Sequence, residues 1–165
     1  MKPLCLDLGT RTGYCFRSGR YLVVGTTNFE PRRGEGAGYR FLRFRHWLEL
    51  THKLHAFGVV YYEQVVGLSA RGGQATQQQV YGGFLAILAA WCEERRIPYS
   101  GVPVPRIKKA ATGKGNASKQ DMIRVARDYL SLENVLEDEW LARLDDNAAD
   151  AYLLLRLVES EGFTN

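Results

Sequence analysis

The first part of the chain combines short apolar runs with glycine-containing turns, a pattern typical of β-strands. The runs predict three strands, at residues 2–8, 13–16 and 21–27. The turns between them are short, which favours an antiparallel meander. A glycine-rich loop at residues 30–38 follows the third strand.

Beyond this loop, apolar residues recur at helical spacing and helices begin to alternate with strands. The spacing predicts a helix over residues 38–57, marked by Leu42, Trp47, Leu50, Leu54 and Phe57. We then expect a strand at 59–63, a loop at 67–73, a helix from 74 to about 96 and a strand at 99–102. One face of this second helix is apolar enough for the core or for a partner chain, and consists of Val80, Phe84, Ile87, Leu88 and Trp91.

The last third of the chain is mainly helical. A short helix is expected at residues 107–111, and Ser118 with Asp121 resembles a capping box that starts a helix through residue 130. A polar linker at 131–138 and a short segment at 140–144 precede the final helix, which begins near Asp145 or Asp146. The order predicts an α/β fold with a mixed five-stranded sheet, a meander plus parallel strands, flanked by helices.

Length and composition fit one domain over residues 1–165. Hydrophobic residues make up 45% of the chain and charged residues 24%, which is ordinary globular composition and excludes a disordered chain. The apolar stretches are too short to span a bilayer, and the first residues carry no apolar signal segment. We expect no membrane association and a cytoplasmic location, in the host cytoplasm for a phage protein, with an organelle matrix as an alternative.

The cysteines and histidines give little support for a metal site. The three cysteines lack C-x-x-C spacing, so buried free thiols are favoured, although Cys5 and Cys15 could be strand neighbours. All three histidines fall in the helix predicted at 38–57. His52 and His55 could share a helix face, but without a third ligand nearby a solvated face is the favoured interpretation.

Acidic residues stand where predicted elements begin or end. Asp7 lies at the end of the first strand, Glu63 closes the strand at 59–63, and Asp145, Asp146 and Asp150 open the last helix. A carboxylate at a buried strand end is costly unless something binds it. Acids from separate elements could converge on Mg²⁺, which prefers hard oxygen ligands.

The net charge is only +4, but the basic residues are unevenly placed. The densest segment contains Arg106, Lys108, Lys109, Lys114, Lys119, Arg124 and Arg127. Smaller patches are Arg32 and Arg33 in the first glycine-rich loop, Arg40, Arg43 and Arg45 after it, and Arg71 in the second loop. Beside clustered acids, a phosphate-binding surface fits better than a solvated basic face, which remains the alternative.

In order and spacing, four motifs resemble the RuvC family of Holliday junction resolvases, within the RNase H-like nucleases. They are LDLGT at residues 6–10 with Gly13 and Tyr14, YEQV at 62–65, NAADA at 147–151, and PRIK at 105–108 followed by GKGNASK at 113–119. The resemblance extends over nearly the whole chain and implies an RNase H-like fold. It also implies structure-selective cleavage of branched DNA, especially four-way junctions.

The resemblance implies roles for particular residues. Asp7, Glu63 and Asp150 would hold two Mg²⁺ ions, with Mn²⁺ as a possible substitute, for phosphodiester hydrolysis that leaves 5′-phosphate ends. Lys119 would act in catalysis, and Lys108 and Lys119 would contact phosphate or steady the transition state. The residues expected to bind DNA are Arg71, Lys108, Lys109, Lys114, Lys119 and Arg124.

The last motif departs from the family pattern. Asn147 stands where the family commonly has an acid or a histidine three residues before the final aspartate. Asp146 lies four residues before Asp150, so that the two carboxylates share a helix face. We therefore expect Asp146 rather than Asn147 to complete the metal site, with Asp145 as the helix N-cap.

Other interpretations remain open. A DLGT motif also opens the phosphate loop of actin-like sugar kinases and chaperone ATPases, but those proteins generally need two such domains. Alternatives within nucleic-acid binding are an RNase H-like nuclease for RNA precursors or flaps, and a non-catalytic protein that binds branched DNA. Because a four-way junction has approximate two-fold symmetry, we expect a homodimer. The resemblance suggests the apolar side of the helix from residue 74 to 96 as the interface, with packing in the core as the alternative for much of that surface.

Overall fold

The structure is a computed structural model that describes residues 1–65, 74–133 and 138–162. Its elements are β1 (Pro3–Asp7), β2 (Arg11–Ser18), β3 (Tyr21–Asn28), α1 (Tyr39–His55), β4 (Val59–Gln64), α2 (Gln74–Arg95), β5 (Tyr99–Pro103), α3 (Val104–Thr112), α4 (Lys119–Glu133), α5 (Asp138–Ala142) and α6 (Asp146–Ser160). The predicted order of strands and helices is confirmed. The loop predicted at 67–73, which includes Arg71, lies outside the described residues.

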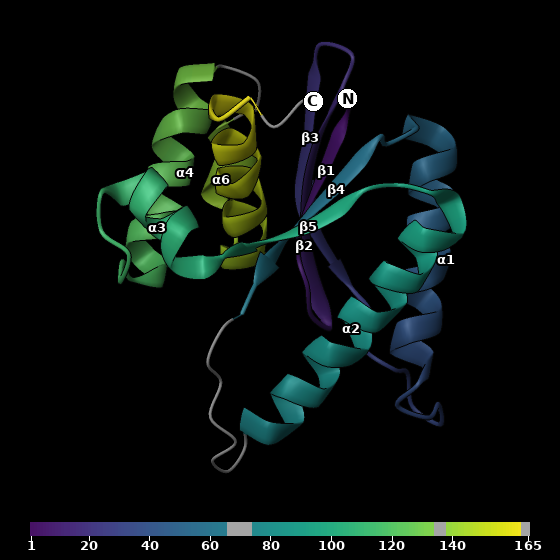
Figure 1. Cartoon of the computed structure of the whole chain (residues 1–165). Coiled ribbons are helices and arrows are strands. Elements are labelled where there is room, and N and C mark those ends of the chain that lie inside the picture. Colours follow the sequence, from purple (N-terminus) through teal and green to yellow (C-terminus); the bar gives the residue numbers. More distant parts are fainter. Residues whose placement is uncertain (66–73, 134–137, 163–165) are drawn as a thin grey trace.

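The strands form one mixed five-stranded sheet in the order β3-β2-β1-β4-β5. Strands β1, β2 and β3 pair antiparallel, as the predicted meander requires, and β4 and β5 extend the sheet in parallel. Helices α3, α4 and α6 cover one face, while α1 and α2 cover the other (Figure 1). The predicted fold class is confirmed.

The alternation of side chains along β1 and β4 assigns residues to the two faces. Leu4 and Leu6 pack in the core on the side of α1 and α2, while Cys5 and Tyr61 belong to the core built on α6. Because successive strand side chains point to opposite faces, Asp7 and Glu63 follow Cys5 and Tyr61 onto the α6 side. The edge of the sheet therefore presents two carboxylates to α6.

Helix α6 is the central helix of that face. Nine of its 15 residues are buried, and it contacts β1, β2, β3 and β4. Its start lies so close to β2 that a Cβ atom on Gly13 would stand 1.9 Å from the backbone oxygen of Asn147. Only glycine permits this approach, which brings the first turn of α6 to the end of β1, since Gly13 pairs with Asp7 in the sheet.

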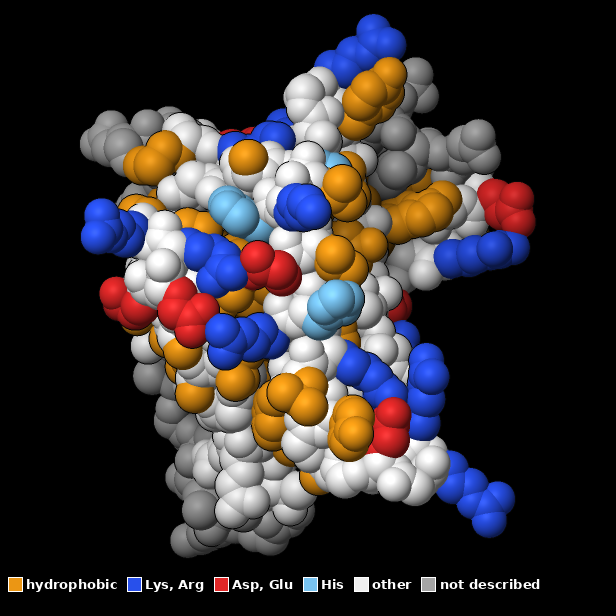
Figure 2. Space-filling view, turned by 90° about the vertical axis from the view of Figure 1, so that its right-hand side faces the viewer, with side chains coloured by type: hydrophobic (Ala, Val, Ile, Leu, Met, Phe, Trp, Pro, Cys, Tyr) orange, Lys and Arg blue, Asp and Glu red, His pale blue; other side chains and the backbone are white. Residues whose placement is uncertain are grey.

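Helix α1 is confirmed, but the apolar residues that predict it are not all buried. Phe44 and Leu48 enter the core, while Leu42, Leu50 and Leu54 are 63%, 48% and 77% exposed. Figure 2 looks onto this side of the molecule and shows apolar side chains among basic ones at its surface. The helical spacing of apolar residues predicts the helix correctly, but it does not identify which of its apolar residues are buried.

Helix α2 packs its apolar face inward. Phe84 and Leu88 are fully buried and Trp91 is almost so, in the same core as Phe44 of α1. The prediction that this face forms the interface of a dimer is therefore wrong for these side chains, because they are buried in the core of the chain itself.

The histidines of α1 are also more enclosed than predicted. The backbone N–H of Phe57 donates a hydrogen bond to Nδ1 of His52, at 3.2 Å. The ring of His55 lies 4.6 Å from that of Phe16, centroid to centroid. The two side chains share the predicted helix face but are half-buried rather than fully solvated, because they pack against residues of the core. Cys5 and Cys15 are strand neighbours and buried free thiols, as predicted.

The helical segments after β5 differ from prediction at their ends. Helix α3 begins at Val104 rather than at residue 107, because Pro105 is accommodated in a first helical turn. The predicted capping box of α4 is confirmed, with hydrogen bonds from the Ser118 N–H to Asp121 and from the Asp121 N–H to the Ser118 hydroxyl.

Helix α4 continues to Glu133, three residues into the linker that the sequence predicts at 131–138. Residues 134–137 of that linker lie outside the described part of the chain. The carboxylate of Glu133 accepts hydrogen bonds from Tyr152, at 2.6 Å, and Arg156, at 2.9 Å, which ties the end of α4 to α6. Across the described ranges, no helix combines the length and apolar character needed to cross a membrane.

Candidate active site

Three half-buried carboxylates meet where β1, β4 and α6 converge. Asp7 ends β1 and Glu63 lies near the end of β4, and the two strands run parallel with Leu6 beside Tyr62. Asp7 and Glu63 therefore lie next to each other on adjacent strands. Asp150 reaches the same place from the second turn of α6, and its charge acts on the pKa values of both.

Burial and mutual repulsion raise the pKa values of all three carboxyl groups. For Asp7 burial is the main cause, followed by the charges of Asp150 and Asp146. For Glu63 burial again dominates, followed by the charges of Asp7 and Asp150. Burial and then Asp146 raise the pKa of Asp150 to about 6. The folded chain therefore holds a group of carboxylates whose charge is poorly compensated.

Two lysines partly offset this charge. Lys119 donates a 2.5 Å hydrogen bond from Nζ to Oδ2 of Asp146, and its charge lowers the pKa values of Asp7, Glu63 and Asp150. Lys108 donates from Nζ to the backbone oxygen of Ala117, at 2.7 Å, and lowers the pKa values of Glu63 and Asp150. The structure thus brings the predicted acids and the two central lysines together.

The first residues of α6 have separate tasks. Asp145 is the N-cap, as predicted, because its Oδ1 accepts from the Ala148 N–H at 3.0 Å. The same carboxylate also accepts from the Thr26 hydroxyl and from Arg11, at 2.6 and 3.0 Å. Asp146 acts on the cluster more strongly than Asp145 does, since its charge raises the pKa values of both Asp7 and Asp150. Its own carboxylate accepts the hydrogen bond from Lys119.

The donor set fits a divalent cation by its chemistry. Within residues 1–65, 74–133 and 138–162, no three Asp, Glu, His or Cys side chains already stand as a closed metal-binding group. The carboxylates of Asp7, Glu63 and Asp150 nevertheless supply hard oxygen ligands, and burial followed by mutual repulsion raises their pKa values although Lys108 and Lys119 partly offset the charge. Mg²⁺ prefers such ligands and binds few of them at once.

The outer basic residues lie on α3, on α4 and in the loop between them. Lys109 and Lys114 are exposed. Arg124 is 66% exposed and lies 3.8 Å from Asp121 and 3.7 Å from Asp128, contacts that are weak for exposed pairs. Arg71, the sixth predicted DNA-binding residue, lies outside the described residues.

Sequence reasoning missed the roles of two residues that shape the site. Thr12 is fully buried, and its hydroxyl donates to the backbone oxygen of Gly9 at 2.6 Å, which fixes the turn directly after Asp7. Gly13 permits the close approach of α6. Gly13 was noticed only as part of a motif, and a threonine near a glycine is a common turn signal that gives no indication of its tertiary role.

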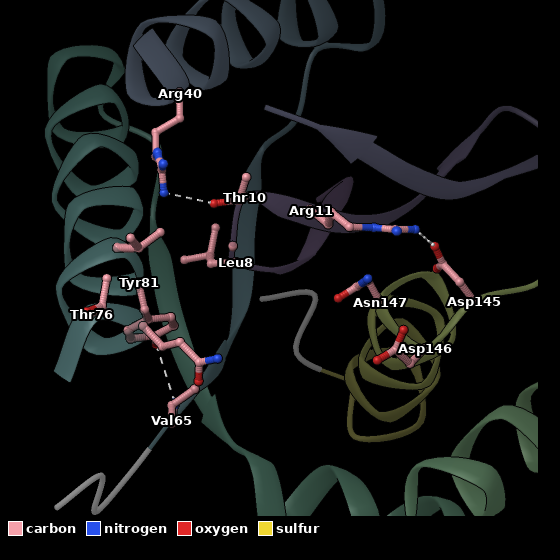
Figure 3. Close-up of a pocket in the computed structure, with 13 residues that line it drawn as sticks. Leu8, Thr10, Arg11, Arg40, Val65, Thr76, Tyr81, Asp145, Asp146 and Asn147 are labelled. Atoms are coloured by element: carbon pink, nitrogen blue, oxygen red, sulfur yellow. Dashed lines mark hydrogen bonds and ion pairs between the residues drawn. The ribbon is translucent and has the colours of Figure 1, made fainter. Parts of the chain in front are cut away.

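A cleft of about 920 Å³ opens beside the carboxylates. It is lined by Leu8, Gly9, Thr10, Arg11, Arg40, Val65, Thr76, Gln77, Val80, Tyr81, Asp145, Asp146 and Asn147. Figure 3 shows that residues from α1 and α2 form one side and residues from the start of α6 the other. The site is therefore an open groove bounded by several elements rather than a closed pocket.

This architecture is an RNase H-like fold, shared with solved structures of Holliday junction resolvases. Thermus thermophilus RuvC in complex with a Holliday junction substrate has 18% identity and a TM-score of 0.66, over 93% of this chain and 91% of that one. A second Thermus thermophilus RuvC structure has 20% identity and a TM-score of 0.67, over 98% of this chain and 97% of that one. The yeast mitochondrial resolvase Ydc2 has 16% identity and a TM-score of 0.60, over 92% and 74%.

The sequence itself gives no comparable match. No protein-family model matches the chain, and no curated protein is similar to it in sequence. At 16–20% identity, the structural matches show a common fold only. They confirm the resemblance to RuvC at the level of architecture.

Proposed function

We propose that this chain is an Mg²⁺-dependent endonuclease that cleaves branched DNA, above all four-way junctions. One observation carries the proposal: three half-buried carboxylates from β1, β4 and α6 lie together, and the charges of Lys108 and Lys119 act on them. A phosphodiester bond needs this combination, because metal ions and lysines both compensate the negative charge of its transition state. The shared fold with junction resolvases directs the proposal to branched DNA.

Each residue has a defined task in this proposal. Asp7, Glu63 and Asp150 would hold two Mg²⁺ ions, or Mn²⁺ in their place, which supply Lewis acidity for hydrolysis that leaves 5′-phosphate ends. Asp146 would complete the acidic group, and it orients Lys119 through their hydrogen bond. Lys119 and Lys108 would face the phosphate from the side of α3 and α4.

The outer basic residues extend this surface along the DNA. Lys109, Lys114 and Arg124 would contact phosphates away from the cut, and the proposal assigns the same role to Arg71. Contacts of this kind increase affinity for any DNA and weaken as salt is added. Selectivity for a branched structure must then come from the arrangement of the strands at the site.

The two-fold symmetry of a four-way junction supports a homodimer with two active sites. Four of the seven large apolar residues that are exposed in the described part of the chain lie on α1: Tyr39, Leu42, Leu50 and Leu54. A hollow of about 430 Å³ lies between several of them. We assign the interface to this α1 surface in place of the buried face of α2. The cytoplasmic location remains a prediction from the sequence.

A panel of labelled substrates tests the proposal. Wild-type protein with Mg²⁺ is incubated with a four-way junction, a linear duplex, a flap and a structured RNA, beside Asp7→Asn. We expect paired nicks in the junction alone, abolished by the substitution. Preferred cleavage of the flap or the RNA would keep the metal site but change the substrate, and junction binding without cleavage would make the chain a non-catalytic branched-DNA-binding protein.

A further inference from the structure

The cleft extends well beyond the carboxylates. At one side it is lined by Asp146 and Asn147 of α6, and at the other by Arg40 in the first turn of α1 (Figure 3). Its volume of about 920 Å³ is at the upper end of the roughly 300–1,000 Å³ typical of ligand pockets. The cleft can therefore take up more of a substrate strand than the one phosphate next to the carboxylates.

Arg40 is a positively charged group held in position at the far side of this cleft. Its Nε donates to the backbone oxygen of Ala37 at 3.1 Å, and its Nη1 donates to the hydroxyl of Thr10 at 3.2 Å. These two contacts orient the plane of the guanidinium. Thr10 belongs to the turn that follows Asp7, so the orientation of Arg40 is tied to the same segment of chain that positions the carboxylate.

The charge of Arg40 is not neutralised as those of its neighbours are. On the same helix, Arg43 pairs with Glu35 and Arg45 pairs with Glu94. In the part of the chain that the structure describes, no carboxylate pairs with Arg40, and its Nη2 has no hydrogen-bond partner. A half-buried arginine with free donors facing a cleft is suited to an anion, and phosphate is the anion whose geometry the guanidinium fork matches.

The wall between Arg40 and the carboxylates is partly apolar. Val80 and Tyr81 of α2 line it together with Leu8. The hydroxyl of Tyr81 donates to the backbone oxygen of Glu63 at 3.0 Å and accepts from the Val65 N–H at 3.4 Å. This wall is thus fixed to the end of β4, and it offers a ring and aliphatic groups to a sugar or a base.

We propose that this cleft is a second phosphate site for the cleaved strand, in which Arg40 binds a phosphate at least one nucleotide away from the scissile one. The proposal rests on the proposed nuclease function and deepens it. The sugar or base between the two phosphates would pack against Val80 and Tyr81. The cleft would set the register of the strand over the carboxylates, with Thr10 as the positioning residue for Arg40.

Binding measurements with matched variants provide the first test. Arg40→Gln is compared with Arg20→Gln, which removes the same charge from an exposed arginine in the β2–β3 turn. Affinity for a labelled four-way junction is measured in EDTA over a series of salt concentrations. We expect Arg40→Gln to lose about tenfold in affinity, and the slope of log K against log salt to fall by about one, as for one lost phosphate contact. Arg20→Gln should stay within twofold of wild type.

Singly modified DNA identifies the phosphate. Neutral methylphosphonate linkages are placed one at a time around the cleavage position in the same junction. For wild type, a neutral linkage at one position on one side of the scissile phosphate should lower the affinity about tenfold. For Arg40→Gln, the same linkage should cause no further loss of affinity, because the contact is already missing. Thr10→Val, which removes the hydroxyl that orients Arg40, should show a partial loss at the same linkage.

The outcomes separate this proposal from the proposed function. If wild type cuts the junction but Arg40→Gln binds like Arg20→Gln, or if its loss is the same at every linkage, the phosphate site is wrong and the nuclease stands. If wild type neither binds nor cuts any branched DNA, both proposals fail. Equal melting temperatures for wild type and Arg40→Gln confirm that a loss of binding is not a loss of folding.

Discussion

Replacing Asp7 by asparagine should stabilise the metal-free protein. The folded chain raises the pKa of Asp7 from 3.8 to about 7, chiefly by burial and then through the charges of Asp150 and Asp146. Between these two pH values the folded state binds more protons than the unfolded state, so stability falls as the pH rises through this window. Above it, the full penalty of a buried carboxylate is present, and Asp7→Asn removes it.

The size of the effect follows from the same pKa values. A pKa raised from 3.8 to about 7 corresponds to a penalty of about 4 kcal/mol at high pH. Glu63 and Asp150 share this repulsion and readjust when Asp7 is neutralised, so we take roughly half, about 2 kcal/mol. For a domain of this length each kcal/mol shifts the melting temperature by about 2–4 °C, which gives a rise of about 4–8 °C.

Calorimetry in EDTA measures this shift. At pH 8, Asp7→Asn should melt above wild type, and the difference should shrink as the pH is lowered and vanish near pH 4. Saturating Mg²⁺ should reverse the order, because the metal stabilises wild type by binding to the folded state alone. The control is Asp128→Asn, an exposed helix acid that should not shift the melting temperature by more than about 1 °C. An Asp7→Asn protein that is less stable than wild type in EDTA at pH 8 would refute the electrostatic argument.

Three further predictions concern the site and the proposed dimer. Gly13→Ala would place a Cβ against the backbone oxygen of Asn147. We therefore expect urea denaturation to show a loss of about 2 kcal/mol in the free energy of unfolding, and the cleavage rate to fall tenfold or more. The control Gly36→Ala, which has open space around it, should leave both quantities unchanged. Lys119→Met should lower the single-turnover cleavage rate about 100-fold with little change in junction affinity, and an unchanged rate would remove Lys119 from catalysis. Leu42→Glu should give a folded monomer in sedimentation measurements with few paired nicks, and a dimer that persists would reject the α1 surface as the interface.

The strand-end acids could be predicted from sequence because their signal is local. Asp7 and Glu63 each end a short apolar run, and the alternation along a strand decides which face they share. The N-cap at Asp145 and the capping box of Ser118 and Asp121 are likewise patterns within four residues. Such elements depend little on the rest of the fold.

The choice of a buried helix face could not be predicted in the same way. Helix α1 carries apolar residues on more than one side, so helical spacing alone did not distinguish the buried Phe44 and Leu48 from the exposed Leu42, Leu50 and Leu54. That choice depends on which residues the sheet and α2 present to the helix, which is information that lies elsewhere in the chain.

Contacts between distant segments were also beyond sequence reasoning. The approach of Gly13 to Asn147 joins residues far apart in the chain, and so does the hydrogen bond from Arg40 to Thr10. Neither produces a periodic or local pattern. The cleft beside the carboxylates consists of such contacts, which is why Arg40 was recognised in the sequence only as one of several basic residues.

Religation of the cleaved junction is the most direct measurement of the central claim. Wild type, Asp7→Asn and the control Asp128→Asn are incubated with a four-way junction and Mg²⁺, and the products are treated with DNA ligase. The account predicts symmetric nicks that ligase seals directly, because hydrolysis leaves 5′-phosphate and 3′-hydroxyl ends, with Asp7→Asn inactive and Asp128→Asn active. Cleavage that survives Asp7→Asn, or nicks that ligase cannot seal, would contradict the assignment of the carboxylate site.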